Sequence, residues 1–257
     1  MIIDTHCHIH EDEYQQPDAA ITRAIDAGVT GMICVGTSEI SSEQAIDFAL
    51  PRGGVYAAFG VHPHESHEGW QKVAELLAAY PDQINKKIVA VGEVGLDYFY
   101  THSPKEVQIE ALRAQLQLAI DYDLPVIFHV REAFDDFWPI FDSFPGIRGV
   151  LHSFTDTKAT LDAALERGLY IGVNGISTFT KDPVQQVMFD SIPLDRMLLE
   201  TDAPFLTPVP FRGTINEPAF VAHVAEFHAK RRNITLDEIA TATTAGANAL
   251  FAGLQHQ

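Results

Sequence analysis

Short apolar runs alternate along the chain with longer stretches in which apolar residues recur at helical spacing. Each run is apolar on successive residues, which is typical of parallel strands that are covered on both faces. We therefore predict a strand at each of eight runs, residues 2–3, 31–35, 55–61, 88–91, 126–130, 149–151, 169–173 and 197–199.

The stretches between these runs predict amphipathic helices. In residues 106–122, Ile109, Leu112 and Leu116 recur at spacings of three and four, which places them on one helical face. A last helix over about 236–251 is expected to begin after Thr235, a good N-cap residue, with Glu238 three residues later. Further helices are predicted at residues 159–167, 183–192 and 218–230.

Eight alternations of strand and helix predict an α/β fold with a parallel sheet. An open doubly wound sheet is the alternative, but eight such units in 257 residues favour a closed (β/α)8 TIM barrel. The first strand is not followed by a Gly-x-Gly-x-x-Gly motif, so nothing supports a dinucleotide site. Because the chain has no linker, low-complexity tract or shift of composition, we expect one domain over residues 1–257.

The charge of the chain excludes some classes of function. Lys and Arg total 17 and Asp and Glu total 35, which gives a formal net charge of −18. Such a chain has no general attraction to anionic membranes or to DNA backbones, so it is not a DNA-coating protein. Two cysteines form no disulfide framework, and no signal core or membrane-length apolar run is evident, so we expect a cytoplasmic protein.

Polar residues follow the apolar runs, where a barrel carries its active site. The active sites of such barrels lie at the C-terminal ends of the strands. His6 and His8 are two residues apart, so on an extended backbone both imidazoles face one side while Cys7 faces the other. The candidate metal-binding residues at these strand ends are His6, His8, Glu93, His129, His152 and Asp202.

Each member of this set has a simpler interpretation when it is taken alone. A His-x-His pair is often two unrelated surface histidines, Glu93 could pair with an arginine or lysine, and Asp202 could cap a helix. The other two histidines could be hydrogen-bonded, partly buried imidazoles. Together the six fall at one structural position, and they exceed a single catalytic zinc site with three protein ligands. They suit two metals that share a bridging carboxylate.

Several stretches of the chain resemble the TatD family of metal-dependent hydrolases, within the amidohydrolase superfamily. The matches run through nearly the whole chain in the family's order, and as a set they are specific. They are residues 4–8 (DTHCH), 60–64 (GVHPH), 92–98 (GEVGLDY), 125–133 (PVIFHVREA), 152–154 (HSF), 200–204 (ETDAP), 212–213 (RG), 216–218 (NEP) and 248–251 (NALF). Ala203 stands where serine is expected and Phe205 where tyrosine is usual, which affects substrate contacts and not metal binding.

The resemblance implies a (β/α)8 barrel and a metal-dependent DNase, an ester-bond hydrolase with 3′–5′ exonuclease action on single-stranded ends. It also implies that the six residues are metal ligands, that Glu93 bridges two ions, and that Glu93 and Asp202 are the catalytic carboxylates. We expect a hydroxide that bridges the two divalent metals to attack the phosphodiester, with Asp202 taking or relaying its proton. Imidazole and carboxylate ligands suit Zn²⁺, Mn²⁺, Fe²⁺ or, less well, Mg²⁺.

Further residues near these ligands are candidates for substrate binding. Arg131 is two residues from His129 and could grip a phosphate with its planar fork, but an ion pair with Asp97 or Glu132 is an alternative. The aromatic residues that follow Asp97 could stack on bases or pack within their loop. Glu200 could bind an additional metal or orient a ligand histidine. The candidates are His62, His64, Tyr98, Arg131, Asn174 and Arg212.

Two other functions compete with a DNase. The same centre could hydrolyse another ester or an amide, such as the ester of a D-aminoacyl-tRNA, since some relatives are linked to that reaction. A non-enzymatic metal-binding or interaction protein is the third hypothesis, but it would not need the complete ligand set. The expected partners are DNA or RNA ends, with no membrane and no obligate protein partner evident.

Overall fold

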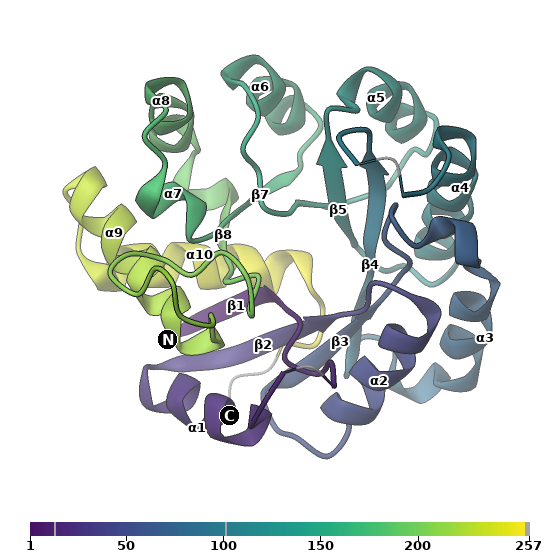
Figure 1. Cartoon of the computed structure of the whole chain (residues 1–257), viewed down its shortest axis with the longest axis horizontal. Coiled ribbons are helices and arrows are strands. Elements are labelled where there is room, and N and C mark those ends of the chain that lie inside the picture. The colour runs from purple at the N-terminus through teal and green to yellow at the C-terminus, as the bar shows by residue number, and fades with distance from the viewer. Residues whose placement is uncertain (13, 101, 255–257) are drawn as a thin grey trace. The chain divides into compact units, whose positions relative to one another are not determined.

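The computed structural model describes residues 1–12, 14–100 and 102–254, along which strands and helices alternate (Figure 1). A strand is present at each of the eight predicted runs. The strands are β1 (Ile2–Cys7), β2 (Val29–Val35), β3 (Val55–Phe59), β4 (Ile88–Asp97), β5 (Val126–Arg131), β6 (Gly149–Leu151), β7 (Tyr170–Val173) and β8 (Met197–Leu199). The α-helices are α1 (Pro17–Asp26), α2 (Glu39–Ala49), α3 (Gln71–Ala79), α4 (Lys105–Asp121), α5 (Phe134–Asp142), α6 (Lys158–Glu166), α7 (Ile176–Phe179), α8 (Pro183–Ser191), α9 (Val221–Arg232) and α10 (Leu236–Leu250).

The chain packs as two compact units. Unit 1 comprises Met1–Ile33 and His152–Ala249, and unit 2 comprises Cys34–Leu151 with Leu250–Leu254. Both units are built from parallel strands followed by helices, which is the arrangement that the alternating pattern predicts.

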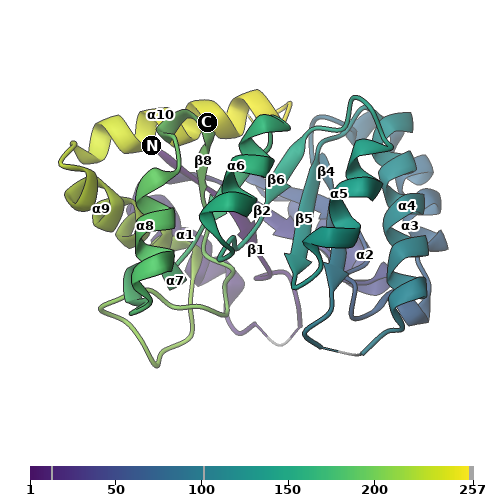
Figure 2. The ribbon, with the colours of Figure 1, turned by 90° about the horizontal axis from the view of Figure 1, so that it is seen from above.

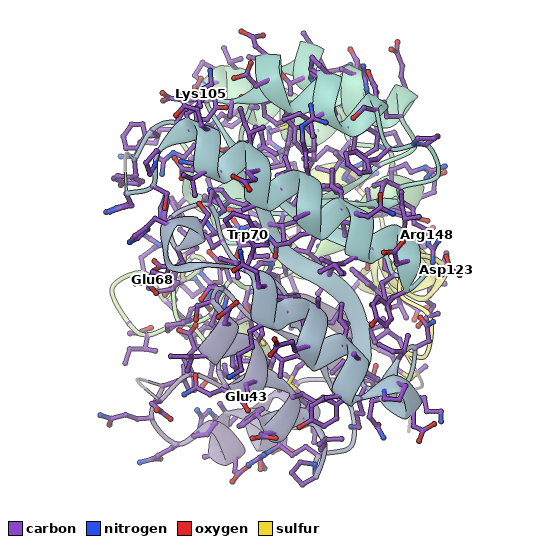
Figure 3. The ribbon with its side chains drawn as sticks, turned by 90° about the vertical axis from the view of Figure 1, so that its right-hand side faces the viewer. Glu43, Glu68, Trp70, Lys105, Asp123 and Arg148 are labelled. Atoms are coloured by element: carbon purple, nitrogen blue, oxygen red, sulfur yellow. The ribbon has the colours of Figure 1, made fainter. Side chains whose placement is uncertain are left out.

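Unit 2 holds four neighbouring parallel strands in the order β3, β4, β5 and β6. In the register of β4 with β5, Gly95 lies beside His129 and Asp97 lies beside Arg131. Helix α4 packs on β4, and the fully buried Phe128 of β5 packs against Phe137 and Phe141 of α5. Figure 3 shows that α4 has Lys105 at one end and Asp123 with Arg148 at the other. Because β4 and β5 are parallel and in this register, their C-terminal ends present neighbouring side chains at one edge of the sheet.

In unit 1, β7 pairs in parallel with β8, β1 contacts β8, and a parallel bridge joins Cys7 to Ala203 in the segment that follows β8. Helix α9 packs against β1 and β8, and α7 contacts both α8 and α9, which lie together in Figure 2. This pairing brings the C-terminal end of β1 next to the segment that follows β8.

The observed elements differ from the predicted ones in extent and number. β1 extends to Cys7, which forms a parallel bridge with Ala203, and β4 extends to Asp97, which still pairs with Arg131 of β5. The region predicted as one helix over 218–230 is a 3-10 turn, Pro218–Phe220, followed by α9. The apolar pattern did not predict α1, α2, α3, α5 or α7. Among the described residues, no helix combines the length and hydrophobicity required to cross a bilayer.

Candidate metal centre

Three histidines and one aspartate converge in unit 1. His6 lies in β1, His8 follows β1, Asp202 follows β8, and His152 comes directly after Leu151. The Nε2 atoms of His6 and His8 are 3.1 Å apart, and they lie 3.7 and 3.4 Å from Asp202 Oδ1. The His152 ring stacks on the His6 ring with 3.8 Å between their centroids. One ligand atom from each of His6, His152 and Asp202 lies within 4.8 Å of the others.

This donor set fits a divalent cation. The Nε2 atoms of His6 and His8 face each other, and each can present a lone pair when its imidazole is neutral, while a carboxylate oxygen lies near both. A cation among them would engage the lone pairs and the carboxylate together, and imidazole with carboxylate is a ligand set for zinc and similar metals. The three histidines are 0%, 4% and 7% exposed, so little water competes for these atoms.

Asp202 is held in its charged form. Burial alone raises the pKa of Asp202, but the hydrogen bond from His8 and the charges of His152 and His6 outweigh burial, and the pKa lies below its ordinary value. The backbone N–H of Asp202 donates to the His6 carbonyl at 2.9 Å. Its φ of 59° lies in the left-handed region, which is uncommon outside glycine. The fold therefore fixes an ionised carboxylate against the imidazoles.

Asp4 ties β1 to the segment after β8. Its carboxyl group accepts hydrogen bonds from the Thr201 backbone N–H at 2.8 Å and from the Thr201 hydroxyl at 2.6 Å. Burial raises the pKa of Asp4 to about 8. The Cys7 thiol donates to the Ile33 carbonyl at 3.4 Å, on the opposite side of β1 from His6, so the alternation predicted for His6, Cys7 and His8 is present.

A second group of possible ligands lies in unit 2. Glu93 in β4 has its Oε1 atom 2.9 Å from His129 Nδ1 in β5 and 3.5 Å from Nε2 of His62, which follows β3. Ligand atoms of these three residues lie within 4.8 Å of one another. From the sequence, His62 is predicted as a substrate contact. Its distance from Glu93 makes it a candidate ligand as well.

Asp97, at the end of β4, orients the residues of this second group. Its Oδ2 atom accepts hydrogen bonds from Nε2 of His64 and Nε2 of His129, each at 3.0 Å. Its Oδ1 atom accepts from the backbone N–H groups of Phe99 and Tyr100 at 2.9 and 3.0 Å. Burial opposes ionisation, but the bonds from His129, Tyr100 and His64 outweigh it and hold the pKa of Asp97 well below its usual range.

This contact favours one tautomer of His129 when the imidazole is neutral. If Nε2 donates its proton to Asp97, the lone pair is on Nδ1, the atom beside Glu93. From the sequence, Asp97 is only a possible ion-pair partner of Arg131. The signal that could have revealed its role is its place four residues after Glu93, which puts both carboxylates on the same face of one strand.

Glu200 lies next to His152 in unit 1. Glu200 Oε1 accepts from the Ser153 backbone N–H at 2.6 Å and lies 3.3 Å from His152 Nδ1, while Asn174 Nδ2 is 3.4 Å away. Glu200 and Asn174 are 1% and 2% exposed. A Cβ atom at Gly172 would collide with Glu200 Oε2, so glycine gives the carboxylate its space. The role of Glu200, as a ligand of an additional metal or as a group that orients a ligand histidine, stays a prediction.

The remaining candidates differ in what they contact. Arg212 donates to the Thr207 carbonyl at 2.8 Å and lies 3.8 Å over the Phe179 ring, which fixes its own loop. The Tyr98 hydroxyl donates to Asp136 at 2.9 Å. Lys105 lies 4.6 Å over the Tyr98 ring. The guanidinium of Arg131, the last residue of β5, instead lies over the exposed rings of Phe99 and Tyr100. The substrate contacts assigned from the sequence stay predictions.

Comparison with known proteins identifies the family. The family model described as "TatD related DNase" matches residues 3–252. The "Uncharacterized metal-dependent hydrolase YabD" of Bacillus subtilis is 35% identical over 98% of this chain and 99% of its own length. The "3'-5' ssDNA/RNA exonuclease TatD" of Erwinia amylovora is 37% identical over 91% of this chain and 93% of its own. The crystal structure of YJJV, a TatD homologue from Escherichia coli, is 32% identical and covers 97% of both chains with a TM-score of 0.89.

These matches extend over both units of the chain. The agreement with the YJJV structure confirms the predicted (β/α)8 barrel fold, and the family confirms the prediction of a metal-dependent hydrolase that acts on ester bonds. The chain belongs to the TatD family of metal-dependent hydrolases.

Proposed function

We propose that this chain is a metal-dependent 3′–5′ exonuclease that acts on the ends of single-stranded nucleic acid. The observation that carries the proposal is the convergence of imidazole and carboxylate groups at the strand ends, one group in each unit. The name of the Erwinia relative, at 37% identity, supports single-stranded DNA or RNA as the substrate class.

The proposed centre holds two divalent ions. His6, His8, His152 and Asp202 are the proposed ligands in unit 1, and Glu93 and His129, with His62 as a further candidate, are those in unit 2. The family resemblance implies that Glu93 would be a ligand common to both ions. Bound divalent ions of this kind lower the pKa of water and neutralise charge on phosphoryl oxygens.

The chain's own residues supply the rest of the chemistry. Asp202 stays ionised beside His6 and His8, so its carboxylate can accept a proton from an attacking water. Asp97 keeps the Nδ1 lone pair of His129 available for a cation. Arg131 can donate two parallel N–H groups to a phosphate, since no carboxylate of the described residues occupies its guanidinium.

The test is nuclease assay of Glu93→Ala and Asp202→Ala on 3′-labelled single-stranded oligonucleotides, with metal content and folding measured on the same samples. Loss of a metal ligand or of the proton acceptor removes several kcal/mol of transition-state stabilisation, so we expect the rate to fall by about 100-fold or more. A rate for either variant that equals the wild-type metal-dependent rate would contradict the proposal.

Matched controls come from exposed acids outside both groups. Glu43, which pairs with Lys72, and Asp123, which pairs with Arg148, are labelled in Figure 3. Glu43→Ala and Asp123→Ala should keep the wild-type rate. Deacylation of a D-aminoacyl-tRNA by the wild-type protein, with no release of nucleotides from oligonucleotides, would assign the centre to another ester instead.

A further inference from the structure

Two exposed aromatic rings and one arginine form a cluster at the C-terminal ends of β4 and β5, which we name the Arg131 platform: Phe99, Tyr100 and Arg131. The Arg131 guanidinium carbon lies 3.9 Å from the centre of the Phe99 ring and 5.0 Å from that of Tyr100. The two rings meet edge to face with 4.7 Å between their centroids. Phe99 is 48% exposed and Tyr100 is 44% exposed, so aromatic surface on both residues faces solvent.

Arg131 has no acidic partner in the described part of the chain, although acids outnumber bases by 35 to 17. Asp97 is its neighbour in the strand register, but the Asp97 oxygens are already occupied by His64, His129 and two backbone N–H groups. The N–H groups at the edge of the Arg131 guanidinium therefore remain available to an external anion.

The platform is fixed to the proposed metal centre. Asp97 Oδ1 holds the backbone N–H groups of Phe99 and Tyr100, and Asp97 Oδ2 holds His129, which is two residues before Arg131 in β5. The Tyr98 backbone N–H donates to the Arg131 carbonyl at 2.9 Å, which continues the pairing of the two strands. One carboxylate thus sets the position of both the rings and a proposed metal ligand.

We propose that the Arg131 platform is a binding subsite for one nucleotide of a single-stranded substrate. The base stacks on the exposed aromatic surface of Phe99 or Tyr100, and a phosphate accepts hydrogen bonds from Arg131. The inference rests on the proposed exonuclease function and extends it to how the substrate is selected. A base within a duplex is stacked on both faces, so only an unstacked base at a single-stranded end can use the platform. Every base has an aromatic face, so the subsite tolerates any sequence.

The experiment compares oligonucleotides that differ only in one base. The metal-loaded protein is assayed on single-stranded thymidine oligonucleotides in which a tetrahydrofuran abasic residue is moved one position at a time from the 3′ end. Affinity is measured by fluorescence anisotropy with phosphorothioate versions that resist cleavage. The abasic residue keeps the phosphates and removes only the stacking base, so it separates stacking from charge.

For the wild type, we expect one abasic position to weaken binding by roughly 5- to 150-fold, the factor that corresponds to the loss of one base–aromatic stack. Phe99→Leu combined with Tyr100→Leu should weaken binding of the intact oligonucleotide by a similar factor and abolish the difference between intact and abasic substrates. KM should rise while kcat and the metal content stay near wild-type values. Arg131→Gln should weaken the binding of both substrates alike, because it removes the phosphate contact and leaves the stack.

A second cation–aromatic pair in unit 2 provides matched controls. Arg52 lies 3.9 Å over the Phe48 ring, the same distance as in the platform, but this pair precedes β3 and is at the N-terminal ends of the strands. Phe48→Leu and Arg52→Gln should leave both KM and the intact-to-abasic ratio at wild-type values. If they changed that ratio as much as the platform variants do, the subsite assignment would be overturned.

The outcomes separate this inference from the proposed function. Wild-type cleavage with equal affinity for intact and abasic substrates at every position overturns the stacking subsite and leaves the exonuclease standing. Base-dependent binding that needs Phe99 and Tyr100, without cleavage under any metal, supports the subsite and overturns the exonuclease. If the protein neither binds nor cleaves single strands, both the stacking subsite and the exonuclease function are overturned.

Discussion

Asp97 shows how a single residue controls a proposed metal ligand. In Asp97→Asn, the amide oxygen can still accept from the Phe99 and Tyr100 N–H groups, but an NH₂ group replaces the oxygen that faces His129 and His64. His129 must then accept at Nε2, which moves its proton to Nδ1, the atom that would bind the metal. We expect metal affinity to fall by roughly 10- to 100-fold, as is usual when the partner of a ligand histidine is lost.

The measurement for this substitution is metal affinity by competition with a chelator, which does not depend on activity. Asp136→Asn is the matched control, since Asp136 accepts from the Tyr98 hydroxyl and contacts neither group of candidate ligands in the described structure. An Asp97→Asn protein that folds normally and keeps the wild-type affinity would show that Asp97 does not set the tautomer of His129.

Sequence reasoning located the proposed ligands but not the contacts that orient them. The spacing of His6 and His8 on an extended strand was enough to place both imidazoles on one side, because strand periodicity is a local rule. The bond from His129 to Asp97 joins residues on neighbouring strands, and it depends on a register that no spacing in the chain reveals. For the same reason the sequence did not distinguish Tyr98, whose hydroxyl bonds to Asp136, from the more exposed Phe99 and Tyr100.

At the scale of elements, helix α10 begins where its sequence predicts. The Thr235 hydroxyl accepts from the Glu238 backbone N–H at 3.1 Å, and Glu238 Oε2 accepts from the Thr235 backbone N–H at 2.7 Å. The two bonds form a capping box, which depends only on two residues that are three apart in the sequence and can therefore be predicted from it. The bond from the Thr235 backbone N–H, with a further bond that the Thr235 hydroxyl donates to Glu238 Oε2 at 2.8 Å, lowers the pKa of Glu238 below its ordinary value.

We therefore expect Thr235→Ala to lower the free energy of unfolding by about 1 kcal/mol, the usual loss when an N-cap side chain is removed. Chemical denaturation of the protein measures the change. Thr235→Ser keeps the hydroxyl and should retain most of the stability. If the alanine and serine variants unfold at the same denaturant concentration, the capping bonds contribute nothing to the folded state.

Other elements could not be recognised from local pattern alone. Helix α5 buries apolar residues on one face and has two aspartates in its first turn, both of which favour a helix, but it carries Pro139 inside it, and an internal proline argues against a helix in the sequence. It is stabilised by aromatic packing, with Phe137 5.1 Å from Phe128 of β5 between ring centroids. Such a helix depends on tertiary contacts, whereas α4 and α10 follow from periodicity and capping.

At the scale of the whole molecule, the net charge of −18 determines how a nucleic acid can bind. Binding that relies on many lysine and arginine contacts becomes much weaker as salt rises, because each neutralised phosphate of a single strand contributes about −0.7 to the slope of log affinity against log salt. In this chain, Arg131 at the strand ends can attract a phosphate, and we propose that bound cations supply the rest of the attraction.

We therefore expect a slope of about −1 or shallower for single-stranded oligonucleotides bound by the metal-loaded protein, and little binding after the metals are removed with a chelator. Fluorescence anisotropy over a series of KCl concentrations, with phosphorothioate oligonucleotides to prevent cleavage, measures both. Arg131→Gln should make the slope shallower still, because it removes one phosphate contact. Arg148→Gln is the control and should not change the slope, because Arg148 pairs with Asp123 beyond the far end of α4 (Figure 3). A slope of about −5 together with strong binding by the metal-free protein would mean that a basic surface binds the substrate, and it would contradict attraction through the metal centre.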